Sequence, residues 1–240
     1  MSSQRILSEA QLSEFYIETF VSDQLDHYGK LIGRSDREQK VIDIGGGAGY
    51  LAAALHENFA VNSTVWDIDP RAIQLARLRG VAAEHKDILL GTDFQSADVV
   101  LFNLVLHHLV MSSNRGTLDA QRRALTNSLE CSDTVLVHEY VYQSFLWEGL
   151  SAYIIWVLTS SRILARVLRF IGRLIPSLNA NTVGIGVRFH SKKGWCNQFE
   201  QAGFEIVRAI DCEDELVSPA RRLLFIKRLH RTTFLLRRSS

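Results

Sequence analysis

The sequence predicts an α/β fold, in which a doubly wound and mostly parallel sheet of about seven strands carries helices on both faces. Short apolar runs alternate with segments of helical periodicity along most of the chain, as in parallel sheets joined by crossover helices. A glycine-rich turn follows the first predicted strand, and an acidic residue follows the second. The last two predicted strands, 204–210 and 222–226, are separated by a short acidic turn, so we expect an antiparallel hairpin.

The composition is that of an ordinary globular protein, with 240 residues, 47% hydrophobic and 22% charged. This length suits one core, so we expect a single domain over residues 1–240, with a helical cap at 1–36 and a helical lid inserted at 144–185. The net charge of +1 gives no overall field that would favour nucleic acid. Residues 221–240 nevertheless hold seven basic residues and no acidic one, which suggests a basic tail.

The three cysteines, Cys131, Cys196 and Cys212, are far apart and odd in number. This spacing matches neither a metal-binding motif nor a disulfide framework, so we expect no metal site. Free thiols fit a reducing compartment, and the first residues lack the apolar run of a secretory signal. We therefore expect a cytoplasmic protein.

The segment 40–55, KVIDIGGGAGYLAAAL, is the central motif of the chain. It predicts a strand at 41–44, a glycine turn, and a helix from Tyr50. Glycine tolerates positive φ and lets a ligand approach the backbone, and the helix that follows offers free N–H groups. A dinucleotide site needs glycines at the first, third and sixth positions, but the sixth position from Gly45 is Tyr50. The sequence instead reads Asp-x-Gly-x-Gly-x-Gly, with Asp43, Gly45, Gly47 and Gly49.

Three further strands end in polar residues. The strand at 63–66 ends in Asp67-Ile68-Asp69-Pro70, where a carboxylate could accept from both hydroxyls of a ribose. Asp69 could instead cap the helix that starts at Pro70 and runs over 71–79. The strand at 81–85 leads to Asp87-Ile88, and the strand at 98–102 leads through Asn103 to His108.

These motifs, in this order, resemble the class I Rossmann-like methyltransferases, which use S-adenosylmethionine (SAM). The late phrase FEQAGFEIV is similar to the same family. The resemblance implies SAM as cofactor and S-adenosylhomocysteine as product, with Asp67 on the ribose, Asp87 on the adenine amino group and Ile88 on its ring. The residues expected to contact the cofactor are Asp43, Gly45, Gly46, Gly47, Gly49, Asp67, Ile68, Asp87, Ile88, Asn103, Leu104 and His108.

Methyl transfer from a sulfonium needs a general base only when the acceptor must lose a proton. The predicted helix at 116–130 precedes a strand at 134–137, which ends in His138-Glu139-Tyr140. Alternation places His138 and Tyr140 on one face of this strand and Glu139 on the other. The catalytic candidates are His107, His108, His138, Glu139, Tyr140 and His190, and the pair we favour is His107 with Glu139.

The insert is unusually apolar, and residues 149–161 carry no charge, but this run of 13 is shorter than the ~20 residues of a membrane span. Farther on, four arginines share one predicted helical face: Arg162, Arg166, Arg169 and Arg173. The insert could be a lid over an apolar acceptor, a contact between two subunits of a homodimer, or a helix on an anionic membrane surface.

The expected function is transfer of a methyl group from SAM to a small, hydrophobic metabolite, with oxygen favoured as the acceptor atom. The exit at 103–106, NLVL, lacks the Asn/Asp-Pro-Pro-aromatic signature of enzymes that methylate bases, so we expect no nucleic-acid partner. Two alternatives remain open. One is a SAM-binding protein of the same fold with a non-methylating role, and the other is a peripheral membrane-associated binding protein.

Overall fold

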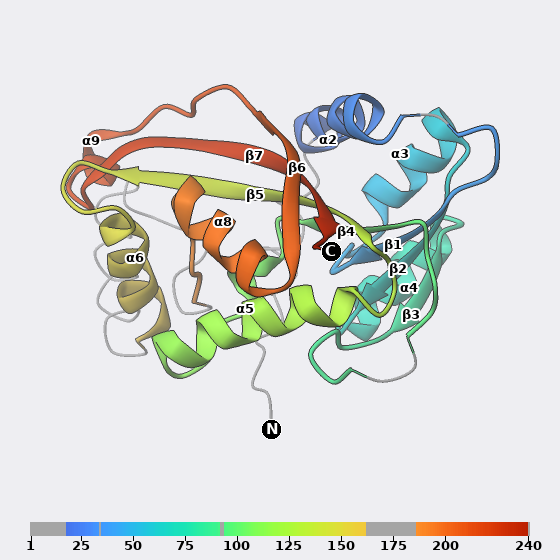
Figure 1. The fold of residues 1–240 in the computed structure, drawn as a ribbon, viewed down its shortest axis with the longest axis horizontal. Coiled ribbons are helices and arrows are strands. Elements are labelled where there is room, and N and C mark those ends of the chain that lie inside the picture. The colour runs from blue at the N-terminus through green and yellow to red at the C-terminus, as the bar shows by residue number, and fades with distance from the viewer. Residues whose placement is uncertain (1–17, 34, 92–93, 162–185, 240) are drawn as a thin grey trace.

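The computed structural model describes residues 18–33, 35–91, 94–161 and 186–239, and its centre is one seven-stranded sheet (Figure 1). The strands are β1 (Lys40–Ile44), β2 (Asn62–Asp67), β3 (Ala82–His85), β4 (Val99–Asn103), β5 (Thr134–Ser144), β6 (Phe204–Asp211) and β7 (Ile226–Arg238). They lie in the order β3-β2-β1-β4-β5-β7-β6, and β7 runs antiparallel to both of its neighbours. The mostly parallel α/β sheet with a terminal antiparallel hairpin is therefore confirmed.

Helices pack on both faces of the sheet. They are α2 (Glu18–Leu31), α3 (Tyr50–Phe59), α4 (Pro70–Leu78), α5 (Asn114–Ser128), α6 (Leu150–Ser160), α8 (Lys192–Gln201) and α9 (Pro219–Arg222), together with a short 3-10 helix, η1 (Leu106–His108). One hydrophobic cluster joins α2 and α3 to the sheet, and a larger cluster joins α5 and α8 to it. These two clusters therefore lie on opposite faces of the central strands.

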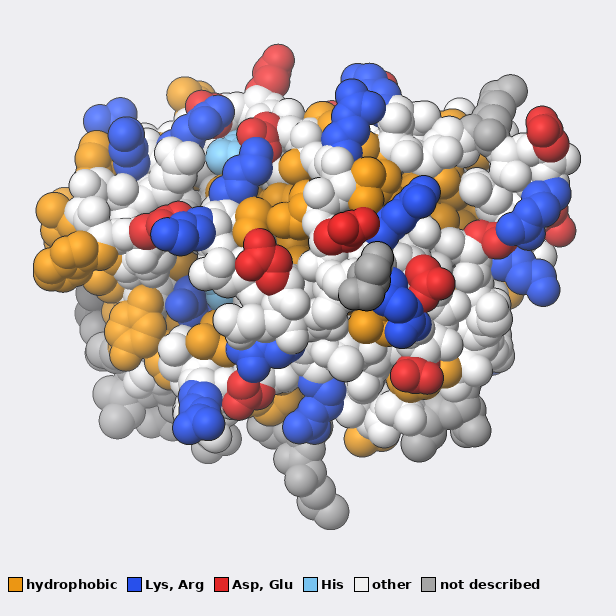
Figure 2. Space-filling view, viewed as in Figure 1, with side chains coloured by type: hydrophobic (Ala, Val, Ile, Leu, Met, Phe, Trp, Pro, Cys, Tyr) orange, Lys and Arg blue, Asp and Glu red, His pale blue; other side chains and the backbone are white. Residues whose placement is uncertain are grey.

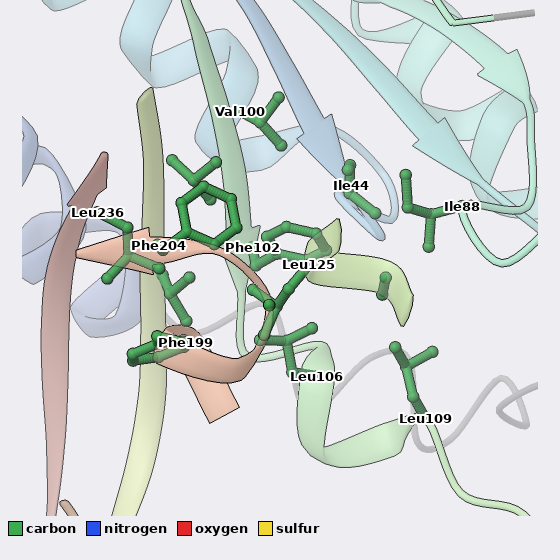
Figure 3. Close-up of a cluster of buried hydrophobic side chains, with 14 of the residues drawn as sticks. Ile44, Ile88, Val100, Phe102, Leu106, Leu109, Leu125, Phe199, Phe204 and Leu236 are labelled. Carbon is green, nitrogen blue, oxygen red and sulfur yellow. The ribbon is translucent and has the colours of Figure 1, made fainter. Parts of the chain in front are cut away.

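The alternation of side chains along each strand divides the core between these clusters. Val41 of β1 packs in the cluster with α2 and α3, whereas its neighbour Ile42 packs in the larger cluster. Figure 3 shows the larger cluster, in which Phe102 of β4, Leu125 of α5 and Phe199 of α8 gather. Because the central strands are buried on both faces, β1 and β4 are nearly continuous apolar runs in the sequence.

The seventh strand lies farther along the chain than predicted. It was expected at 222–226, but β7 spans Ile226–Arg238, and the residues just before it form α9. The basic residues of this stretch suggested a tail, yet Leu229 and Phe234 are almost fully buried, and Arg231 pairs with Asp23 of α2 at 3.1 Å. The prediction was wrong because the basic residues suggested a tail, whereas residues 232–236 between them are buried in the middle of the strand.

Two other elements differ from their predicted bounds for local reasons. α5 begins at Asn114, because the Ser113 hydroxyl accepts from the Gly116 N–H at 3.0 Å and caps the helix there. β5 continues to Ser144, because it pairs with β7 along its whole length. Of the predicted lid at 144–185, the structure describes α6, whereas Arg162, Arg166, Arg169 and Arg173 lie outside the described residues. Within the described part of the chain, no helix is long and apolar enough to cross a membrane.

Candidate active site

The predicted glycine loop joins β1 to α3 where the strand order reverses. β2 and β3 lie on one side of β1, and β4 and β5 lie on the other. Open α/β sheets bind ligands outside the carboxyl ends of their strands at such a reversal. We call this place, at the carboxyl ends of β1, β2 and β4, the carboxyl edge. Gly45, Gly47 and Gly49 take φ angles of 68°, 57° and 75° there, which glycine adopts without steric strain.

Two of the loop glycines are required by the packing of neighbouring side chains, whether or not a ligand is bound. A Cβ atom added at Gly45 would overlap the side chain of Val105, and one added at Gly46 would overlap the carboxylate of Asp43. At Gly47, apart from the glycine and its two chain neighbours, no atom of the described residues lies within 4 Å of such a Cβ atom. Gly47 is therefore the loop position at which a ligand can come closest to the backbone.

Asp67 stands at the end of β2, where the motif predicted it. Its carboxylate accepts from the Gly47 N–H at 3.1 Å and from the Asp69 N–H at 2.8 Å, so it is tied to the glycine loop. Burial raises the pKa of the Asp67 carboxyl, and these two backbone hydrogen bonds oppose that effect. Asp69 caps α4 by accepting from the Arg71 N–H at 2.9 Å, so the capping interpretation of Asp69 is confirmed.

Asp43 lies beneath the glycine loop and is fully buried. Neither of its carboxylate oxygens has a hydrogen-bond partner among the described residues. Burial, with a smaller contribution from the charge of Asp67, raises the pKa of Asp43 to about 7. The Asp43 carboxylate thus lies against the Gly46 backbone, beneath the loop.

The residues after β3 form a compact turn. The Asp87 carboxylate accepts from the Leu89 N–H at 2.9 Å, and the Ile88 carbonyl accepts from the Asn127 side chain at 2.7 Å. Ile88 is only 6% exposed and packs in the larger hydrophobic cluster. Ile68, after β2, lies at the same end of the sheet, where its carbonyl oxygen is 3.0 Å from His85 Nε2.

The chain leaves β4 through Asn103, the last residue of the strand, and Leu104, which has an unusual backbone conformation. Asn103 Oδ1 accepts from Gln24 Nε2 of α2 at 3.0 Å. Leu104 has a φ of 53°, in the left-handed region, which costs a bulky L residue roughly 1–2 kcal/mol. Its N–H donates to the His138 carbonyl at 2.8 Å, which anchors this turn to β5. Such strain is common where the backbone serves a functional site.

The fold brings together the predicted pair, His107 of η1 and Glu139 of β5. His107 Nδ1 lies 2.7 Å from Glu139 Oε2, and both side chains are buried, at 3% and 0% exposed. A carboxylate only accepts hydrogen bonds, so Nδ1 carries the proton and Nε2 is the nitrogen that can take one. The His107 backbone N–H also donates to Glu139 Oε1 at 3.3 Å, which fixes the carboxylate.

Aromatic rings surround this pair. Phe189 stacks on His107 with ring centroids 4.8 Å apart, and Tyr140 meets the imidazole edge-on at 5.9 Å. Phe189 also stacks on Tyr142 at 4.4 Å. The backbone holds this arrangement, because the Arg188 N–H donates to the His107 carbonyl at 2.8 Å.

The other candidate histidines have different surroundings. His108 lies beside His107, with ring centroids 4.1 Å apart, and burial holds its pKa well below the usual value. His138 points away from the pair toward β7, where its Nδ1 is 2.7 Å from Thr233 Oγ1. His190 Nε2 is 2.8 Å from Gln121 Oε1, and burial lowers the pKa of His190 to about 3. His190 therefore supports the packing as a neutral group.

Residues 16–209 match the family described as "Methyltransferase domain". The chain belongs to this methyltransferase family. The match confirms the resemblance drawn from the motifs. The methyltransferase is similar in fold to 1,6-didemethyltoxoflavin-N1-methyltransferase of Burkholderia thailandensis, with 15% identity, a TM-score of 0.59, and coverage of 95% of this chain and 81% of that one. A comparison with curated proteins finds no match.

Two more solved structures have the same fold as this methyltransferase. The magnesium protoporphyrin IX methyltransferase of Synechocystis shares 14% identity at a TM-score of 0.56, over 100% of this chain and 90% of that one. A cyclopropane synthase of Mycobacterium tuberculosis shares 12% identity at a TM-score of 0.60, over 97% and 95%. The toxoflavin and protoporphyrin enzymes hold bound S-adenosylhomocysteine. At these identities the likeness shows the fold alone.

Two residues at the site of this methyltransferase carry no signal in the sequence. Gln24 lies in the predicted helical cap at 1–36, and its side chain donates to Asn103. Phe189 follows the insert as an isolated aromatic residue, and only the fold stacks it on His107. Both contacts join segments that are more than 75 residues apart in the chain.

Proposed function

We propose that this methyltransferase binds SAM at the carboxyl edge and transfers its methyl group to a small, hydrophobic acceptor. The observation that carries the proposal is the joining of the glycine loop to the Asp67 carboxylate at that edge. Gly47 admits a ligand to the backbone, and a carboxylate with several acceptor sites can take both ribose hydroxyls. SAM, when bound, supplies an activated methyl group, so positioning by the protein can lower the barrier by up to ~7–11 kcal/mol.

The His107–Glu139 pair favours an acceptor hydroxyl over nitrogen or carbon. His107 Nε2 would take the hydroxyl proton and leave an electron pair on oxygen, while Glu139 stabilises the imidazolium that forms. The surrounding rings of Tyr140 and Phe189 suit an apolar acceptor. Transfer of radiolabel from SAM to a component of a cell extract would identify the acceptor. Bound SAM that labels no acceptor would contradict the proposed transfer.

Asp67→Ala is expected to weaken SAM binding by ~1–3 kcal/mol, because it removes a partly buried, charge-assisted acceptor. Calorimetric titration with SAM measures this change. Thermal unfolding without ligand shows whether the variant is folded. Asp214→Ala, which changes an exposed carboxylate paired with Arg228, serves as the control and should bind SAM as the wild type does. Equal affinities of the Asp67 variant and the control would contradict the ribose assignment.

Gly47→Ala is expected to weaken SAM binding, whereas Gly46→Ala is expected to lower the stability of the fold. The Gly47 variant should fold with a loss of about 1 kcal/mol for its positive φ, yet bind SAM at least about tenfold more weakly, because the methyl group projects toward the ligand. The Gly46 variant should lose stability without any ligand, because its methyl group overlaps the buried Asp43 carboxylate. Denaturant unfolding and calorimetry separate the two effects. A Gly47 variant with wild-type affinity would place the ligand elsewhere.

We also propose that one end of the molecule contacts an anionic membrane surface. Hydrophobic side chains gather at the left edge of Figure 2, over the β5–α6 turn and α9 of Figure 1. Phe145, Leu146 and Trp147 are 52%, 61% and 74% exposed, and the Phe145 N–H donates to the Phe225 carbonyl at 2.9 Å. The neighbouring exposed residues Arg222 and Lys227 are basic, which complements anionic lipid, whereas Arg221 pairs with Glu215 at 3.6 Å.

Flotation with vesicles tests this contact. The full chain is expected to bind phosphatidylserine-containing vesicles more than pure phosphatidylcholine, and Trp147→Ser should reduce this binding. Leu78→Ser, at a residue 77% exposed on α4, is the matched control and should bind as the wild type does. No preference for the anionic vesicles would contradict the proposal. A dimer that Trp147→Ser disrupts would assign the surface to a second copy.

A further inference from the structure

Three side chains with metal-binding chemistry meet on the α2 side of the sheet, away from the His107–Glu139 pair. They are His27 of α2, His138 of β5 and Cys212, which directly follows β6. One ligand atom from each lies within 4.8 Å of the other two. The two histidines are 6% and 3% exposed, and the cysteine is half-buried.

The sheet order explains how residues so far apart in sequence meet. β7 lies between β5 and β6, and its Thr233 is opposite both His138 of β5 and Ile210 of β6. Cys212 follows β6 at the same end, where its N–H donates to the Arg231 carbonyl at 2.8 Å. α2 lies across these strand ends, and its Asp23 pairs with Arg231 at 3.1 Å.

Hydrogen bonds to one hydroxyl oxygen, with each Nδ1–H as the donor, orient both imidazoles. His27 Nδ1 lies 2.6 Å from Thr233 Oγ1, and His138 Nδ1 lies 2.7 Å from the same oxygen. The second ring nitrogen of His138 is buried and has no hydrogen-bond partner among the described residues. Histidine ligands of metals usually make such a bond through their other ring nitrogen, which fixes the tautomer and the ring orientation. A buried imidazole nitrogen without a partner points to a ligand.

We propose that His27, His138 and Cys212 bind a divalent transition metal ion, with Zn²⁺ as the ion that best suits these donors. Two imidazoles and one thiolate match zinc, whereas Ca²⁺ and Mg²⁺ require oxygen donors. The site leaves a fourth position for water or another donor. Its role is to tie α2 to the middle of β5 and to the end of β6, and α2 in turn holds Asn103 through Gln24.

Metal binding at this site requires two neutral imidazoles and one thiolate. Burial lowers the pKa of His27, and lowers that of His138 to about 3, so both imidazoles are neutral and ready to coordinate. Burial raises the pKa of Cys212 to about 11, so binding would release the thiol proton to solvent. Arg231 adds a positive charge nearby, which the carboxylates of Asp23 and Glu215, at 3.1 and 3.8 Å from its side chain, offset.

Titration of the full chain with Co²⁺ tests the proposal, because cobalt replaces zinc and reports its ligands by absorption. We expect one ion per chain, visible bands typical of tetrahedral Co²⁺, a thiolate-to-cobalt charge-transfer band, and displacement by Zn²⁺. Cys212→Ser should abolish the charge-transfer band, and His27→Gln should weaken binding by at least about tenfold. Cys196→Ser and His85→Gln are controls in the same chain and should leave the spectrum unchanged.

Two results would overturn the proposal. One is a wild-type spectrum without the charge-transfer band at saturating Co²⁺. The other is a band that persists in Cys212→Ser or disappears in Cys196→Ser. Thermal unfolding without metal shows whether each variant is folded, and His27→Gln provides a second test if Cys212→Ser does not fold. These readouts do not depend on SAM or on methyl transfer, so failure here and failure of the proposed function are distinguishable.

Discussion

Glu139→Gln is expected to lower the rate of methyl transfer to a hydroxyl acceptor by about 10²–10⁴-fold, the usual contribution of a general base. The glutamine amide can donate to His107, so it no longer fixes the proton on Nδ1 or stabilises an imidazolium. Transfer of label from SAM measures the rate. Calorimetry measures SAM affinity, which should change little because neither residue is among the expected cofactor contacts.

His107→Gln should lower the rate as far as Glu139→Gln does, and the double variant should be little slower than either one, because the two residues act as a unit. His56→Gln, at an exposed residue in the last turn of α3, should retain wild-type activity. A Glu139 variant with an undiminished rate would show that the pair only supports the fold. Transfer would then depend on positioning alone.

Asp43→Asn is expected to change how the free energy of unfolding depends on pH. The carboxyl has a pKa of about 7 in the folded protein against an ordinary 3.8, so the folded state holds this proton more tightly. As pH rises from about 4 to about 7, the unfolded state loses the proton first, and the folded state loses stability. At 1.36 kcal/mol per pH unit, the loss attributable to Asp43 reaches at most about 4 kcal/mol.

The asparagine variant cannot ionise, so its stability relative to the wild type should rise across that interval and be greatest at pH 8. Urea unfolding at several pH values from 4.5 to 8 measures the difference. Asp26→Asn, in an exposed pair with Lys30 one turn away on α2, is the control and should differ from the wild type by less than about 0.5 kcal/mol. A difference for the Asp43 variant that does not vary with pH would show that Asp43 keeps one charge state throughout.

Features that depend on short-range sequence patterns were predictable. The parallel strands could be recognised because burial on both faces requires continuous apolar residues, as in β4. The loop at 45–49 and Asp67 could be located because the order of strand, turn and helix places them at one edge. His107 and Glu139 could be paired because His107 follows β4 and Glu139 lies just beyond the predicted end of the neighbouring strand β5.

Features that depend on long-range packing were not predictable. β7 was misplaced because ion pairs such as Arg231 with Asp23 exist only in the folded sheet. Asp43 stays a predicted cofactor contact, but only the fold shows that its carboxylate lies against the Gly46 backbone. The cluster of His27, His138 and Cys212 has no spacing motif, because its members come from distant parts of the chain.

The position of β7 constrains the order of events during synthesis. β1 to β5 can pair with one another as they leave the ribosome, but β6 pairs in the sheet only with β7, which is made after it. β6 therefore cannot join the sheet until β7 is translated. Until then, the amphipathic helix α8, which packs beside β6, also lacks its final packing partner. Because late, non-local pairing slows folding and exposes strand edges, the nascent chain needs protection from aggregation longest at β5 and β6.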